Sequence, residues 1–124
     1  MKGALYLAAY LLIAVGVAHS ILGERYILIR LFRRDNLPKL FGGTDFTTRT
    51  IRFVWHILSI AWWGFAAILF CLAYGTISLQ VIAMVIGITF VATGITALVI
   101  SRAKHLAWVI FIVVGTITIC VGVT

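Results

Sequence analysis

Four long stretches without a single acidic or basic residue divide this chain, at 5–22, 53–74, 77–100 and 106–123. Each is close to the ~20 residues that an α-helix needs to cross the hydrocarbon of a bilayer. The stretches are apolar on nearly every face, whereas strands of a membrane barrel alternate apolar and polar residues. We therefore expect an all-α, polytopic membrane four-helix bundle in which residues 1–124 form a single transmembrane domain.

The connections between the stretches predict how the helices are joined. Residues 75–76 and 101–104 are too few for anything but antiparallel neighbours, so the last three spans should form an up-down series beside which the first span packs. The loop 23–52 is longer. Its segment 24–34 mixes apolar residues with arginines, as an amphipathic helix lying in the interface does, although the first span could equally continue through it. Pro38 ends this helix, and Thr44 or Asp45 is expected to cap the next.

Small residues recur along the first and third spans and predict where helices approach closely. Ala14 and Ala18 lie four apart on the first span, and the third span carries Ala83, Gly87 and Gly94. A second stripe on the third span consists of Thr89, Thr93 and Thr96, whose hydroxyl groups are expected to bond back to their own helix.

Composition and charge placement fix the class of protein and its expected orientation. The chain is 64% hydrophobic and 10% charged, and it carries a net charge of +7. Nine of its ten bases lie in the first and third connections, namely Arg25, Arg30, Arg33, Arg34, Lys39, Arg49, Arg52, Arg102 and Lys104. The positive-inside rule makes these connections cytoplasmic and places both termini outside, as for a multi-pass protein of the bacterial inner (plasma) membrane. The charge then indicates contact with anionic lipid headgroups, not with nucleic acid.

Two further features of the sequence bear on processing and redox state. The apolar run after Lys2 lacks a convincing small-residue cleavage site, so we expect the first span to be retained. Cys71 and Cys120 both lie toward the predicted outer face, where they could form a disulfide or remain buried thiols. The absence of a Cys-x-x-Cys pair disfavours a thiol-oxidising enzyme.

The three histidines are the residues that could carry chemistry. His19 closes the first span, His56 opens the second and His105 opens the fourth, so all three lie near the basic end at depths within about one helical turn. If their side chains converge, they could form a mononuclear centre for zinc, copper or iron. Glu24 would face away from His19 on an ideal helix and could join only if the helix loosens at Gly23.

Haem b is the alternative cofactor, with two histidines as axial ligands and an arginine meeting a propionate. The pattern of His19, Gly23 and Arg25 resembles the haem-bearing segment of succinate dehydrogenase membrane-anchor subunits over seven residues. That resemblance implies that His19 ligates haem and that Arg25 lies near the propionates. The segments around His19 and His56 also resemble a group of small four-span bacterial membrane proteins of unassigned function, which implies no activity.

The sequence leaves several functions open. A metal-binding or haem-binding, possibly redox, membrane protein follows from the histidine layer. The alternative is a non-catalytic accessory or assembly subunit of a larger membrane complex or homo-oligomer. A small oligomeric transporter is less favoured, because the three acidic residues lie outside the charge-free spans. No nucleophile-base pair or phosphate-binding loop indicates an enzyme class, so enzymatic activity stays open.

Overall fold

The computed structural model describes residues 1–124 as a chain of helices, which confirms the all-α prediction. Its elements are α1 (Lys2–Leu22), the π-helix η1 (Gly23–Leu28), α2 (Ile29–Leu31), α3 (Asp45–Tyr74), α4 (Leu79–Ser101) and α5 (Ala107–Val123). The only β-type pairing is one isolated bridge between Leu40 and Gly43. The helical segments therefore match the four charge-free stretches, and most of their ends differ by only a few residues. The start of α3 and the end of the first helix instead extend well into the first connection.

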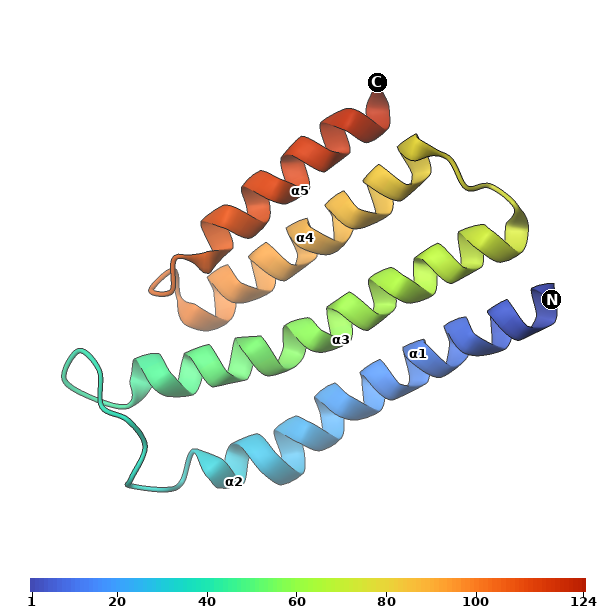
Figure 1. Ribbon diagram of the computed structural model, residues 1–124. Helices are drawn as coiled ribbons and strands as arrows, with labels where there is room; N and C mark the ends of the chain where they lie inside the picture. The colour runs from blue at the N-terminus through green and yellow to red at the C-terminus, as the bar shows by residue number, and fades with distance from the viewer.

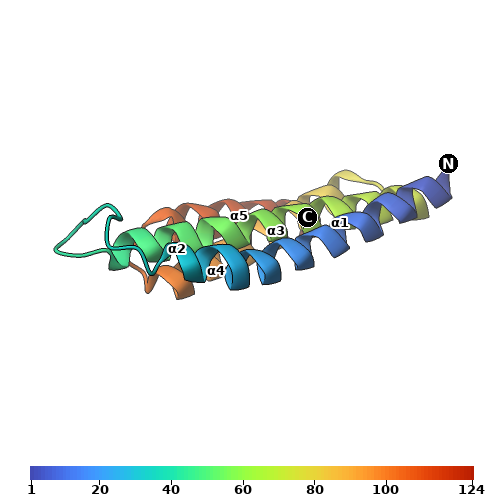
Figure 2. The same cartoon turned by 90° about the horizontal axis from the view of Figure 1, so that it is seen from below.

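The helices lie side by side in a single layer, in the order α1, α3, α4, α5 (Figures 1 and 2). Helix α1 has no Cα atom within 8 Å of α4 or α5, and α3 has none within 8 Å of α5. The up-down series predicted from the short connections is confirmed, and α1 joins it at the α3 edge. The chain termini lie at the same end of the layer as the α3–α4 connection (Figure 1).

The predicted interfacial helix in the first connection is wrong. Instead, the first helix continues through η1 and α2 as one helical segment of 30 residues, Lys2–Leu31. This was the open alternative, and its physical reason is that no proline interrupts the chain before Pro38. Thr44 does lie at the start of α3, but its side chain makes no capping hydrogen bond.

Three helical segments are long and apolar enough to cross a membrane, namely Lys2–Leu31, Asp45–Tyr74 and Leu79–Ser101. Helix α5 is equally apolar but has 17 residues, about 25 Å at the rise of an α-helix. Helix α3 has 30 residues and so extends about 45 Å, against about 30 Å for bilayer hydrocarbon. Helix α3 is therefore longer than the apolar thickness of a bilayer, and its first turns carry the charged residues.

Glycines hold α4 and α5 in close contact, as the small residues of the third span predicted. A Cβ added to Gly87 would lie 2.9 Å from the carbonyl oxygen of Gly115, and one added to Gly94 would meet Ile112 at 2.8 Å. The threonine stripe bonds within its own helix, as expected, with Thr89, Thr93 and Thr96 donating to the carbonyls four residues earlier at 2.7–2.9 Å.

The prediction of which small residues pack on the first helix is partly wrong. Ala14 is exposed, whereas Ala9, Gly16 and Gly23 are buried at intervals of seven residues. The packed face of the first helix therefore repeats every seven residues, and not every four as Ala14 and Ala18 suggested.

The one-layer arrangement also keeps the two cysteines apart. Cys71 on α3 and Cys120 on α5 are free, and no Cα atoms of their helices lie within 8 Å of each other. A disulfide needs Cα atoms at about 4.4–6.8 Å.

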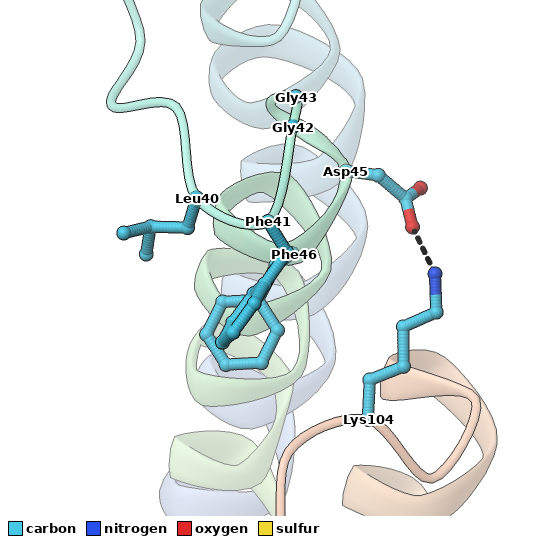
Figure 3. A pocket seen from close by; sticks show the side chains of 7 residues that line it. All are labelled: Leu40, Phe41, Gly42, Gly43, Asp45, Phe46 and Lys104. Carbon is cyan, nitrogen blue, oxygen red and sulfur yellow. Dashed lines mark hydrogen bonds and ion pairs between the residues drawn. The ribbon is translucent and has the colours of Figure 1, made fainter.

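Ion pairs join the start of α3 to the α4–α5 connection at the basic end of the layer. Asp45 accepts from Arg49 at 2.8 Å and from Lys104 at 3.1 Å, beside a shallow pocket of about 470 Å³ (Figure 3). Arg49 also donates to the carbonyl oxygen of Ile100 at 3.1 Å. The two ion pairs of Asp45 are exposed and are expected to contribute little stability each.

Candidate functional site

The contact between α1 and α3 contains a ladder of side-chain hydrogen bonds to backbone oxygens. Three residues of α3 spaced four apart donate to carbonyl groups on successive turns of α1. The bonds run from Trp55 Nε1 to His19 O at 3.0 Å, from Ser59 Oγ to Gly16 O at 2.8 Å and from Trp63 Nε1 to Ile13 O at 3.3 Å. In membrane helix pairs generally, hydrogen bonds between helices add to the van der Waals packing that holds the helices together.

Gly16 of α1 and Gly23, the first residue of η1, make room for the indole rings of this ladder. A Cβ atom at Gly16 would fall on the ring of Trp63, and one at Gly23 would fall on the ring of Trp55. The glycines are therefore needed for close approach and not for an unusual backbone conformation. Trp55 and Trp63 are thus bonded between helices.

The π-helix η1 begins at Gly23 and carries Glu24 into the α1–α3 contact. A π-turn holds more residues per turn than an α-turn, so it rotates the residues that follow it, and such turns recur at functional sites. The helix therefore does loosen at Gly23, which was the expected condition for Glu24 to turn toward a histidine. Glu24 does not reach His19, however; its carboxylate lies against His56.

The carboxylate of Glu24 contacts two basic side chains from consecutive turns of α3. Arg52 contacts both of its oxygens, with Nη2 at 2.9 Å from Oε1 and Nε at 3.2 Å from Oε2. His56 Nε2 lies 3.0 Å from Oε2. The side chains of Glu24, Arg52 and His56 are 31%, 37% and 22% exposed, so water reaches one side of the cluster.

Two serines extend this cluster into the buried part of the helix pair. His56 Nδ1 lies 3.0 Å from Ser20 Oγ, and Ser20 Oγ lies 2.7 Å from Ser59 Oγ. Ser59 is fully buried and donates to the carbonyl of Gly16. We call the connected set Arg52, Glu24, His56, Ser20 and Ser59 the polar network.

His19 lies beside the network and has partners of its own. Its ring stacks on the indole of Trp55 with centroids 4.5 Å apart and planes 5° apart. Its Nε2 lies 3.2 Å from the carbonyl oxygen of Trp55, while Trp55 Nε1 donates to the carbonyl of His19. Each of the two residues therefore bonds to the backbone of the other, which joins α1 to α3.

His105 lies apart from the other two histidines, among aromatic rings. It stacks on Phe46, with centroids 5.6 Å apart, and meets Phe53 edge-on at 5.0 Å. Its Nδ1 accepts from the backbone N–H of Ala107 at 3.3 Å. Shared depth therefore did not bring the three histidines to one point, because the layer spreads the helices sideways.

The predicted cofactor residues can be compared with this geometry. No group of three His, Cys, Asp or Glu side chains is placed to hold a metal ion, and the structure identifies none of His19, His56 and His105 as a metal ligand. Arg25, predicted to meet a haem propionate, lies over the ring of Tyr26 at 5.6 Å, and Arg52 takes the place of the arginine in the site. The zinc, copper, iron and haem b assignments stay predictions.

The three main pockets lie outside the α1–α3 contact. The largest is an apolar groove of about 530 Å³ between α3 and α4, reaching Phe111 of α5. A smaller one of about 270 Å³ also lies between α3 and α4. None of the three main pockets is lined by a histidine.

Sequence reasoning identified part of this site. It singled out His56, which does contact α1, as do Ser59 and Trp63 on the same helix. Ser20 and Arg52 were missed, although the spacing of Trp55, Ser59 and Trp63 could have indicated a face that bonds to a neighbouring helix. Comparisons of the chain with protein-family models, with curated proteins and with solved structures found no match, so its geometry alone supports a function.

Proposed function

We propose that this protein is a non-catalytic accessory or assembly subunit of a larger membrane complex in the bacterial inner membrane. Its basic connections lie in the cytoplasm and both termini lie outside, in accordance with the positive-inside rule. The observation that supports an accessory role most directly is the apolar groove between α3 and α4. The molecule that carries it is one helix thick (Figure 2).

The polar network supports a structural use of the ionisable residues. His56 has partners at both ring nitrogens, both oxygens of Glu24 contact Arg52, and Ser59 is bonded to both Ser20 and Gly16. A catalytic centre needs a group free to meet a substrate in a cleft. Here the polar side chains join helices instead.

We assign one occupant to the groove, a membrane-spanning helix of a different polypeptide. On α3 the groove runs from Val54 to Ile68, about 21 Å at the rise of an α-helix, which is most of the hydrocarbon thickness. Its lining includes the small residues Ala61, Gly64 and Thr93, which let a second helix approach closely.

Photo-crosslinking in intact membranes tests this assignment. A photoreactive amino acid at Phe65, which lines the groove and is 61% exposed, should give one adduct heavier than the 13.7 kDa chain by the mass of a distinct polypeptide. Ile95 is the matched control, since it is 50% exposed on α4 but does not line the groove. Ala61→Phe, which fills the groove, should abolish the adduct at Phe65.

Two results would overturn the proposal. An adduct of twice the chain mass alone would show that a second copy, and not another polypeptide, occupies the groove. A Soret band or stoichiometric transition metal in the purified protein would instead support the metal or haem prediction and a redox role.

A further inference from the structure

The hydrogen bonds of the polar network form a chain whose donors can be counted. Ser59 Oγ lies 2.8 Å from the carbonyl oxygen of Gly16, which can only accept. A serine hydroxyl has one proton, so Ser59 has none left for Ser20 at 2.7 Å. Ser20 must therefore donate to Ser59.

The same count fixes the state of the imidazole. Because the single hydroxyl proton of Ser20 points to Ser59, the bond of 3.0 Å between Ser20 Oγ and His56 Nδ1 requires a proton on Nδ1. A neutral imidazole then has a bare Nε2, which could not bond to an ionised carboxylate. Yet His56 Nε2 lies 3.0 Å from Glu24 Oε2.

From this geometry we infer that the protein contains a proton-binding site, in which one exchangeable proton is held between His56 Nε2 and Glu24 Oε2. Arg52 contacts both oxygens of Glu24, an arrangement that suits a carboxylate, so the proton resides on the imidazole. Glu24 is part-exposed at the basic end of the layer, where water can take up or supply the proton.

The charged and titratable groups around His56 are few. Glu24 and His19 come from the first helical segment, and Arg52 lies one turn away on α3 itself. Helix α4, which packs on the other edge of α3, contains no titratable side chain. The carboxylate of Glu24 is thus the one anion in contact with the imidazole.

Loss of this proton necessarily removes one link between α1 and α3. If the proton leaves Nε2 for water, the Nε2 lone pair faces the carboxylate oxygens and that bond is lost. If the remaining proton moves to Nε2, Nδ1 must accept from Ser20. Ser59 then either donates to Ser20 and loses its bond to Gly16 O, or keeps that bond and leaves no proton between the two serines. Protonation and helix contact are therefore coupled in this site.

Nitrogen NMR of the ¹⁵N-histidine-labelled full chain in nanodiscs tests the inference. At about pH 7.5 an ordinary histidine is mostly neutral. We expect one of the three histidines to show protons on both ring nitrogens at this pH, and His56→Gln to remove that signal. Glu24→Gln should convert the signal to that of a neutral ring, while the signal of His105, which is identified by His105→Gln, stays unchanged.

An infrared spectrum covers the other position of the proton. A carboxylic-acid band that disappears in Glu24→Gln would place the proton on the carboxyl group and would still support a shared proton. Neutral imidazole at all three histidines of the wild-type protein, together with an ionised Glu24, would overturn the inference. This outcome needs no variant, so it is decisive even if the substituted chains fail to fold.

Discussion

Replacement of Gly23 by alanine tests the close contact of α1 and α3, because one methyl group has two opposing effects there. In a helix interior, alanine is more favourable than glycine by about 0.8–1.0 kcal/mol. At Gly23, however, the added Cβ would occupy the position of the Trp55 indole, which must then move away.

The magnitude of the loss follows from the contacts of Trp55. Its bond to the carbonyl of His19 is worth about 0.6 kcal/mol, and at most about 1.7, by analogy with bonds between membrane helices. The stack on the His19 ring adds about 0.5–1.5 kcal/mol. The loss of these two contacts exceeds the gain in helix propensity, so Gly23→Ala should lower the free energy of unfolding. Any further loss of packing around the indole would lower it more.

Gly3→Ala provides the matched control on the same helix, since nothing lies within 4 Å of a Cβ at that position. The two alanine variants should differ in free energy of unfolding by about 1–3 kcal/mol, the sum of the two Trp55 contacts. Unfolding by SDS in mixed micelles, followed by circular dichroism, measures both. In a Trp55→Leu background the penalty at Gly23 should largely vanish, because the clashing ring is gone. A Gly23→Ala protein at least as stable as the wild type would refute the described packing.

Three further predictions concern other contacts, two of them measured by the same unfolding assay and one by crosslinking. Ser59→Ala removes a buried donor and should cost about 1–2 kcal/mol, whereas Thr96→Val, which loses only a bond within its own helix, should cost less; equal losses would argue against the ladder. Gly115→Leu should separate α4 from α5, detected as a loss of crosslinking between cysteines introduced on the two helices, because its Cβ would lie 2.8 Å from backbone atoms of α4. Asp45→Asn breaks two exposed ion pairs and should change stability by less than about 1 kcal/mol at low salt and by less still in 1 M NaCl; a larger, salt-independent loss would contradict their exposure.

The sequence specified the helices well because hydrophobic runs and short connections are local properties. The sequence could not specify which helices lie next to each other. His105 and His56 were predicted to be close because they lie at similar depth, but depth says nothing about which helices are neighbours. In a single layer those residues meet different partners.

The π-turn shows a second limit of sequence reasoning. Ideal α-helical geometry turned Glu24 away, and the position of a π-turn depends on partners across the interface as well as on the residues that form it. Gly23 suggested a weak point, yet only the contacts of Trp55 and His56 explain why the helix widens there. Arg25 was preferred over Arg52 for a similar reason, because a motif read along the chain ignores residues on the facing helix.

A layer one helix thick leaves most of this protein without an interior of its own. Only 15 of its 124 residues are buried, so for the proposed membrane protein lipid chains would complete the packing around nearly every helix. Acyl-chain length and lateral pressure would then act on the α3–α4 groove as core substitutions act on a soluble protein. Changing the lipid is thus expected to alter helix arrangement without any change in sequence, and removal of bound lipid during purification is itself a structural perturbation.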